Sequence, residues 1–187
     1  MMWRRALTAL ALAGAMLAGA GSDTARAHGL PGSVLTLQQA ENRLELVIEL
    51  PLEDLIIAEQ KLAPLAEAEP GAPLPSQQAS AIAAYFADHL ALGQDACPAA
   101  LTLTEARLRA AQDHHRGRYM LVIARFAVAP ADTAPLWPLE LRYDAVMHEV
   151  RSHRAMVYWR ASDGAAQGLA DFGYHTALRG PLVLQRD

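Results

Sequence analysis

The sequence predicts a mainly β protein, an immunoglobulin-like antiparallel β-sandwich with one inserted α-helix. Short segments rich in β-branched and large apolar residues recur along the chain, turn-forming residues separate them, and one segment near residue 80 has helical periodicity. Short strands that are joined by turns typically pack as two antiparallel sheets. Residues 28–187 suit one such domain and leave no room for a second.

The first two predicted strands form a hairpin. Residues 33–37 (SVLTL) and 43–50 (RLELVIEL) alternate in part between apolar and polar residues, and residues 38–42 supply a short polar connection. Alternation with a period of two places the apolar side chains on one face of a strand. Pro51 ends the second strand because it has no backbone N–H to donate. Residues 52–58 come next and have the composition of one or two helical turns.

The middle of the chain combines a predicted loop with the predicted helix. Residues 63–75 contain four prolines, so we expect a surface loop with little sheet pairing. Ser76 is expected to cap the next helix. The helix is predicted because apolar residues recur on one face. These residues are Ala79, Ile82, Phe86 and Leu90.

The C-terminal half predicts six further strands, each bounded by turn-forming residues. The polar stretch 113–117, the proline-bearing stretch 129–138 and the SDG at 162–164 are typical of turns. The predicted strands cover residues 100–109, 118–128, 139–143, 154–161, 167–172 and 182–185. With the first hairpin they give eight short strands, which is enough for two sheets.

The N-terminal 27 residues have the three parts of a secretory signal peptide. Two arginines precede an uncharged run at residues 6–21, and the ARA at 25–27 matches a signal-peptidase site. The run is shorter than the roughly 20 apolar residues that a transmembrane helix needs. We therefore expect cleavage after Ala27, export to the periplasm, and a mature chain of residues 28–187 without membrane insertion.

The charge and the cysteine content limit the possible partners and cross-links. The chain has 16 basic and 20 acidic side chains, and the first 27 residues hold three of the basic and one of the acidic ones, so cleavage changes the formal charge from -4 to about -6. An acidic chain without a dense basic run repels phosphate backbones, so we expect no nucleic-acid partner. Cys97 is the only cysteine and cannot form an intramolecular disulfide. We expect it to be a small apolar core residue.

Cleavage after Ala27 would make His28 the first residue of the mature chain. An amino-terminal histidine offers an amine nitrogen and an imidazole nitrogen to one metal ion, and a second histidine would complete a three-nitrogen copper site. Polysaccharide monooxygenases and some periplasmic copper carriers begin in this way. The sequence has no disulfide pair and no aromatic-rich substrate face, so a histidine-brace copper oxidase is the less favoured use of His28.

The segment YDAVMHEVRSHR holds the strongest internal metal-ligand candidates. His148 and His153 lie five residues apart, and Asp144 is nearby. The two histidines would diverge on a continuous helix but could meet in a turn between strands. One interpretation is a site for a divalent cation, copper or nickel, that these three residues form either alone or together with His28. The other is structural, with an ion pair between Asp144 and Arg154 and with His153 packed at the edge of the sandwich.

The sequence contains no motif of a common enzyme class. It has no HExxH, no CxxC, no phosphate-cradling glycine loop and no GxSxG. His114 and His115, between Asp113 and Gly117, have the composition of a solvated hairpin tip. A Ser–His–Asp grouping is neither indicated nor excluded, because residues far apart in the sequence can form one.

Five segments of residues 28–165 occur in a recognisable order. They are AHGLPGSVLTL, RLELVIELPLEDL, IAAYFADHLAL, RYMLVIARF and LELRYDAVMHEVRSHRAMV, with anchor positions at Asp54, Leu55, Tyr143, Asp144, His153 and Arg154. This order resembles the exported N-terminal domain of HupE/UreJ-type membrane proteins. In that group a signal peptide and a β-rich periplasmic domain precede a multi-helix membrane domain associated with the transport of metals, often nickel. The sequence lacks that membrane domain, and it has one cysteine where the group often has a pair.

These observations predict a non-catalytic periplasmic accessory or binding domain, linked to metal handling or to a membrane transporter partner. One alternative is a small copper- or nickel-binding protein that uses His28 and internal histidines. The other is an enzyme, either a copper oxidase or a hydrolase. Transport activity is not part of what the resemblance implies for this chain.

Overall fold

The computed structural model describes residues 32–40, 43–94, 97–114, 117–129 and 137–186. The predicted signal peptide lies outside these residues. The strands are β1 (Ser33–Ala40), β2 (Arg43–Pro51), β3 (Leu90–Gln94), β4 (Cys97–Pro98), β5 (Ala100–Asp113), β6 (Gly117–Ala129), β7 (Leu139–Tyr143), β8 (Arg154–Arg160), β9 (Ala166–Gly173) and β10 (Leu182–Leu184). The helical segments are α2 (Leu52–Ala58), the 3₁₀ helix η1 (Gln60–Glu67), α3 (Ser76–His89) and α4 (Tyr174–Ala177).

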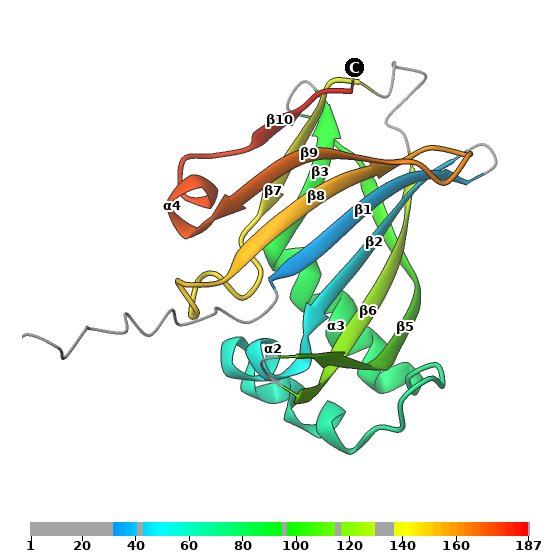
Figure 1. Cartoon of the computed structure of the whole chain (residues 1–187), viewed down its shortest axis with the longest axis vertical. Helices are drawn as coiled ribbons and strands as arrows, with labels where there is room; N and C mark the ends of the chain where they lie inside the picture. Colours follow the sequence, from blue (N-terminus) through cyan, green and yellow to red (C-terminus); the bar gives the residue numbers. More distant parts are fainter. Residues whose placement is uncertain (1–31, 41–42, 95–96, 115–116, 130–136, 187) are drawn as a thin grey trace, which may run out of the picture.

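The strands form two sheets (Figure 1). The larger sheet has the order β5-β6-β2-β1-β8-β9, and the smaller has the order β10-β7-β3-β4. The described strand pairs are antiparallel, except that β1 and β8 are parallel. The prediction of a mainly β, two-sheet sandwich is therefore confirmed. The eight predicted strands all appear, and β3 and β4 are additional.

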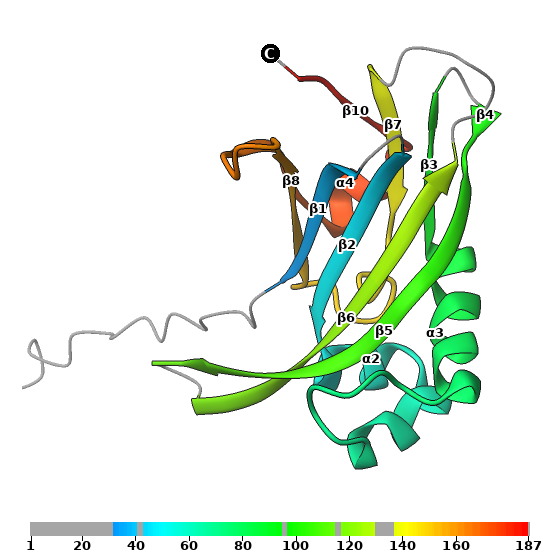
Figure 2. The same cartoon turned by 90° about the vertical axis from the view of Figure 1, so that its right-hand side faces the viewer.

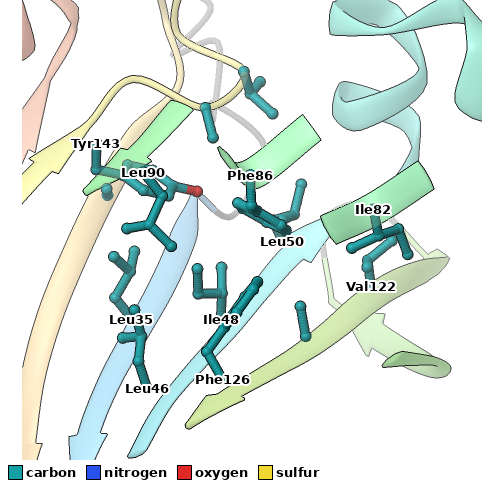
Figure 3. Packing of buried hydrophobic residues seen from close by; sticks show 14 of the residues in the cluster. Leu35, Leu46, Ile48, Leu50, Ile82, Phe86, Leu90, Val122, Phe126 and Tyr143 are labelled. Atoms are coloured by element: carbon teal, nitrogen blue, oxygen red, sulfur yellow. The ribbon is translucent and has the colours of Figure 1, made fainter. Parts of the chain in front are cut away.

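The β1–β2 hairpin shows why these residues form strands. Leu35 lies opposite Ile48, and Leu37 lies opposite Leu46, and all four side chains are buried. The residues between them are half-buried, so one face of the hairpin belongs to the core and the other faces outward. Figure 3 shows Leu35, Leu46 and Ile48 side by side in this core.

The second layer consists of the smaller sheet and helix α3. The helix leads directly into β3, and Figure 2 shows both on the same side of the larger sheet. Ile82 and Phe86 are buried on the predicted helix face. The ring of Phe86 packs edge-on against Phe126 of β6, with 5.5 Å between the ring centroids. Ser76 is the first helical residue rather than the cap, a shift of one position from the prediction.

One local expectation is correct only in part, and another is wrong. Residues 63–67 of the predicted loop belong to helix η1, whereas residues 68–75 form a largely exposed loop. The end of this loop lies along the edge of β5, where Gly71 N donates to Leu108 O and Leu74 N to Ala106 O, each over 2.8 Å. This contact covers part of an open strand edge, which would otherwise be free to pair with another chain. Cys97 is exposed and not a core residue.

No helix in the described part of the chain has the length and apolarity to span a bilayer.

Candidate functional site

Four polar side chains form a continuous hydrogen-bonded series inside the sandwich, which we call the buried chain. The Tyr143 hydroxyl donates to Ser33 Oγ over 2.6 Å. Ser33 Oγ lies 2.8 Å from His153 Nε2. His153 Nδ1 lies 2.9 Å from Asp54 Oδ2. The buried chain therefore joins β7, the start of β1, the residue before β8 and helix α2.

The backbone of Ser33 assigns the protons of the buried chain. Its N–H also donates to His153 Nε2, over 3.1 Å. Nε2 is therefore an acceptor, so the ring proton is assigned to Nδ1, which donates to Asp54. The Ser33 hydroxyl accepts from Tyr143 and donates to the same Nε2. Burial of the Tyr143 phenol raises its pKa above the ordinary value, although the hydrogen bond with Ser33 opposes this shift.

The buried chain has the connectivity of a Ser–His–Asp hydrolase triad. Its exposure is different: Ser33 is 0 % exposed, Asp54 1 % and His153 3 %. A nucleophile has to reach a substrate carbonyl, and the Ser33 hydroxyl meets only protein atoms here. Asp54 Oδ1 is buried without a hydrogen-bond partner among the described residues. The observed arrangement holds four segments together, and it leaves the Ser33 hydroxyl inaccessible to a substrate.

A second group of polar rings lies at the C-terminal end of α3, and we call it the histidine pair. The rings of His89 and His148 are stacked, with 4.2 Å between the ring centroids and 5° between the ring planes. His89 Nδ1 lies 3.0 Å from Asp144 Oδ1. His148 Nδ1 lies 3.3 Å from the backbone oxygen of the same Asp144. Unlike the buried chain, this group is partly open to solvent, since the side chain of His89 is 21 % exposed and that of Asp144 37 %.

The loop after β7 has an unusual backbone that holds the histidine pair in place. Val146 has a φ of 67°, a conformation that costs a β-branched residue energy. The Tyr85 hydroxyl accepts a hydrogen bond from Val146 N over 2.8 Å, and the Tyr85 ring lies 4.6 Å from that of His89. Burial raises the pKa of Tyr85 to about 12, and the charges of Asp144 and Glu59 add to the shift, while the Val146 N–H opposes it.

The structure gives the predicted ligands different surroundings. Both ring nitrogens of His153 are engaged within the buried chain, so neither is free for a metal ion. His148 is one ring of the histidine pair, and Asp144 contacts both rings of that pair. His28 lies outside the described residues. The described residues include no group of three or more His, Cys, Asp and Glu side chains placed to hold a metal ion.

The structural interpretation of this segment is correct only in part. The predicted ion pair between Asp144 and Arg154 is not formed, because Arg154 pairs with Asp171 over 2.6 Å. His153 is a packing residue, as that interpretation expected, but it lies in the core rather than at an edge. His114 is exposed in the β5–β6 turn, in agreement with a solvated hairpin tip, while His115 lies outside the described residues.

The sequence reasoning missed Ser33, Tyr85 and His89 as site residues. Ser33 lies 120 positions from His153, and His89 lies 55 positions from Asp144. No local pattern joins residues at such separations. The one short-range signal was the four-residue spacing between Asp144 and His148, which the structure uses for a side-chain bond to a backbone oxygen.

Comparison with protein families and with curated proteins gives no match. The fold and the two polar groups are therefore the basis for a proposed function.

Proposed function

We propose that this chain is an exported, non-catalytic accessory or binding domain that works with a membrane transporter or another metal-handling partner. The observation that carries the non-catalytic part is the sealed Ser33 hydroxyl. Ser33, His153 and Asp54 are the residue types of a hydrolase, yet each is at most 3 % exposed. Their hydrogen bonds stabilise the sandwich instead of activating a nucleophile.

The resemblance to the exported domain of HupE/UreJ-type proteins supports the accessory role. Three of its anchor positions, Asp54, Tyr143 and His153, are members of the buried chain. The resemblance thus concerns residues that hold the fold together. The signal-peptide pattern in residues 1–27 supports export to the periplasm.

The non-catalytic part is tested with a fluorophosphonate probe, which labels activated serines. We expect no labelling of Ser33 in the folded protein, and we expect p-nitrophenyl acetate hydrolysis by the wild type to equal that by Ser33→Ala. A fluorophosphonate adduct on Ser33, found by peptide mass spectrometry and absent from His153→Gln, would contradict the proposal.

The export and partner parts need experiments in cells. Intact-mass analysis of the periplasmic fraction should find a chain that begins at His28, whereas a retained leader would contradict export. A photoreactive residue can then be placed at the exposed apolar positions Ile57, Leu178 and Val183. We expect at least one position to cross-link to a membrane transporter or a metal-handling protein. If none of the three positions cross-links to a protein of either kind, the proposed partner is contradicted.

A further inference from the structure

The histidine pair has a feature that the proposed function does not use. The two Nδ1 atoms face oxygens of one residue, Asp144, and neither Nε2 atom has a hydrogen-bond partner among the described residues. A neutral imidazole whose Nδ1–H is held by an oxygen presents a free lone pair on Nε2. This is the arrangement in which histidines bind metal ions, because the oxygen fixes the tautomer and the ring orientation.

We propose that His89 and His148 form a two-imidazole site for a divalent transition-metal cation of the copper, nickel and zinc class. Imidazole nitrogen is a preferred donor for these ions. Asp144 is the positioning residue, since it faces both Nδ1 atoms. Other coordination positions are left to solvent or to a partner's ligand, because the described residues offer no third protein ligand.

The backbone sets the positions of the two histidines. Leu90 and Tyr143 are paired in the β3–β7 ladder, and the next pair outward is His89 with Asp144, joined by a hydrogen bond from Asp144 N to His89 O of 3.2 Å. His148 lies four residues after Asp144 and returns to it through a tight turn. The positions of both rings are therefore set by a sheet register and by a buried loop, whose residues Ala145, Val146 and Met147 are each 0 % exposed.

The local charge favours a cation. His89 is the last residue of the 14-residue helix α3, and the C-terminal end of a helix carries partial negative charge. The Asp144 carboxylate adds negative charge at the histidine pair, since its Oδ1 lies 3.0 Å from His89 Nδ1. No positively charged side chain is paired with Asp144 in the described residues; its ion-pair partner is His89.

The stacked rings of His89 and His148 need one rotation before they can chelate a single ion. Parallel rings direct their lone pairs side by side, so a single ion needs one ring to turn toward the other. His148 is the ring that turns, because its bond to the Asp144 backbone oxygen, at 3.3 Å, is longer than the 3.0 Å contact of His89. His148 is also partly exposed, whereas Ala145, Val146 and Met147 of the same loop are fully buried.

The test is a titration of the protein with CuCl₂, in which binding is measured by calorimetry and by electron paramagnetic resonance. The measurements are made on His28→Gln, because a free terminal histidine would bind copper by itself. We expect one equivalent of Cu(II) to bind with nitrogen couplings from two imidazoles. His89→Gln and His148→Gln should each lower the affinity at least tenfold. Asp144→Ala should lower it by roughly 10-fold, because it removes the carboxylate that positions the His89 ring but keeps the backbone oxygen that faces His148.

His175→Gln is the matched control, since His175 is an exposed histidine on α4. It should leave the affinity within twofold of the His28→Gln parent, and circular dichroism should show that every variant is folded. Binding that is unchanged in His89→Gln and His148→Gln would overturn the site. So would an equal loss in His175→Gln, or copper binding that disappears in the His28→Gln parent. None of these outcomes bears on the Ser33 labelling result, so the two proposals fail separately.

Discussion

The buried chain and the histidine pair share one kind of contact and differ in the surroundings of the second ring nitrogen. In each, an imidazole Nδ1 meets an aspartate oxygen, over 2.9 Å for His153 with Asp54 and over 3.0 Å for His89 with Asp144. The Nε2 of His153 also accepts from Ser33, whereas the Nε2 of His89 has no partner in the described structure. The partner of the second nitrogen and the access of solvent decide whether the same residue types stabilise a fold or remain open for chemistry.

The two regions lie at opposite ends of one short loop, residues 144–153. The loop places Asp144 beside α3 and His153 inside the sandwich, and between them Val146 adopts its positive φ. Tyr85 holds that strained residue through Val146 N. The loop therefore connects the two regions. Because its two ends differ in burial, we expect substitutions there to differ in their effect on stability.

The largest expected effect is the loss of His153. In His153→Ala the Ser33 N–H and the Asp54 carboxylate lose their partner inside the core, and a cavity forms. We expect the free energy of unfolding to fall by about 3–5 kcal/mol, measured by urea denaturation at neutral pH. The matched variant His148→Ala should lose less than about 1 kcal/mol, because its ring is partly exposed.

A double variant sharpens this comparison. Replacing both partners of a buried pair with apolar residues removes the unpaired groups that each single replacement leaves. We therefore expect the double variant His153→Leu, Asp54→Leu to lose less unfolding free energy than the sum of the losses in the two single variants. Strict additivity would show that the His153–Asp54 contact contributes little to the fold.

The next effect concerns the hydrogen bond that holds the loop. Tyr85→Phe keeps the ring but leaves the buried N–H of Val146 without its acceptor. We expect a loss of about 1–3 kcal/mol in unfolding free energy. Amide hydrogen exchange provides a second measurement, because the Val146 amide should lose its protection and exchange faster than the amides of the strands. Unchanged exchange at Val146 would mean that the loop is held by other contacts.

Alkaline titration tests the two buried phenols. The pKa of Tyr85 is raised from 10.0 to about 12, and that of Tyr143 is raised as well. Above pH 10 the unfolded chain therefore loses these protons before the folded chain does, so stability is complete below pH 10 and falls as the pH rises toward 12. Urea midpoints should decline across this window, and the decline should be shallower in Tyr85→Phe. If the urea midpoint of Tyr85→Phe declined with pH as steeply as that of the wild type, Tyr85 would not be the source of the decline.

The smallest effect is expected at the surface pair of Arg154 and Asp171. Both side chains are 60 % exposed. Water and salt screen such a pair, so Arg154→Ala should change the unfolding free energy by less than about 1 kcal/mol. Thermal melts in low and high salt provide the measurement. A larger loss would show that exposure is a poor guide to the difference between the two histidine regions.

Much of the fold could be predicted because its signals are local. The alternation in residues 43–50 and the apolar face of residues 76–90 are visible within short windows, and the structure has a strand and a helix there. Strand β3 was missed because Leu90 also continues the helical periodicity, and only pairing with β7 makes it the start of a strand. Cys97 was misplaced because residue type alone does not reveal which strand edge faces solvent.

The two polar groups could be predicted only in fragments. His153 and Asp144 were identified as candidates from their spacing, but their partners come from distant segments that the sheets bring together. The role of each histidine also depends on burial. A sequence shows that histidine and aspartate are present, whereas the packing around them decides which nitrogen stays free.

The most direct test of the contrast between the two regions is a long-range ¹H–¹⁵N correlation spectrum of the histidine rings, recorded on ¹⁵N-labelled His28→Gln with and without one equivalent of ZnCl₂. We predict that His153 shows the Nδ1–H tautomer and that its signals do not change with zinc. The Nε2 signals of His89 and His148 should shift together. Zinc-dependent shifts at His153, or no shifts at His89 and His148, would contradict the distinction between the buried chain and the histidine pair.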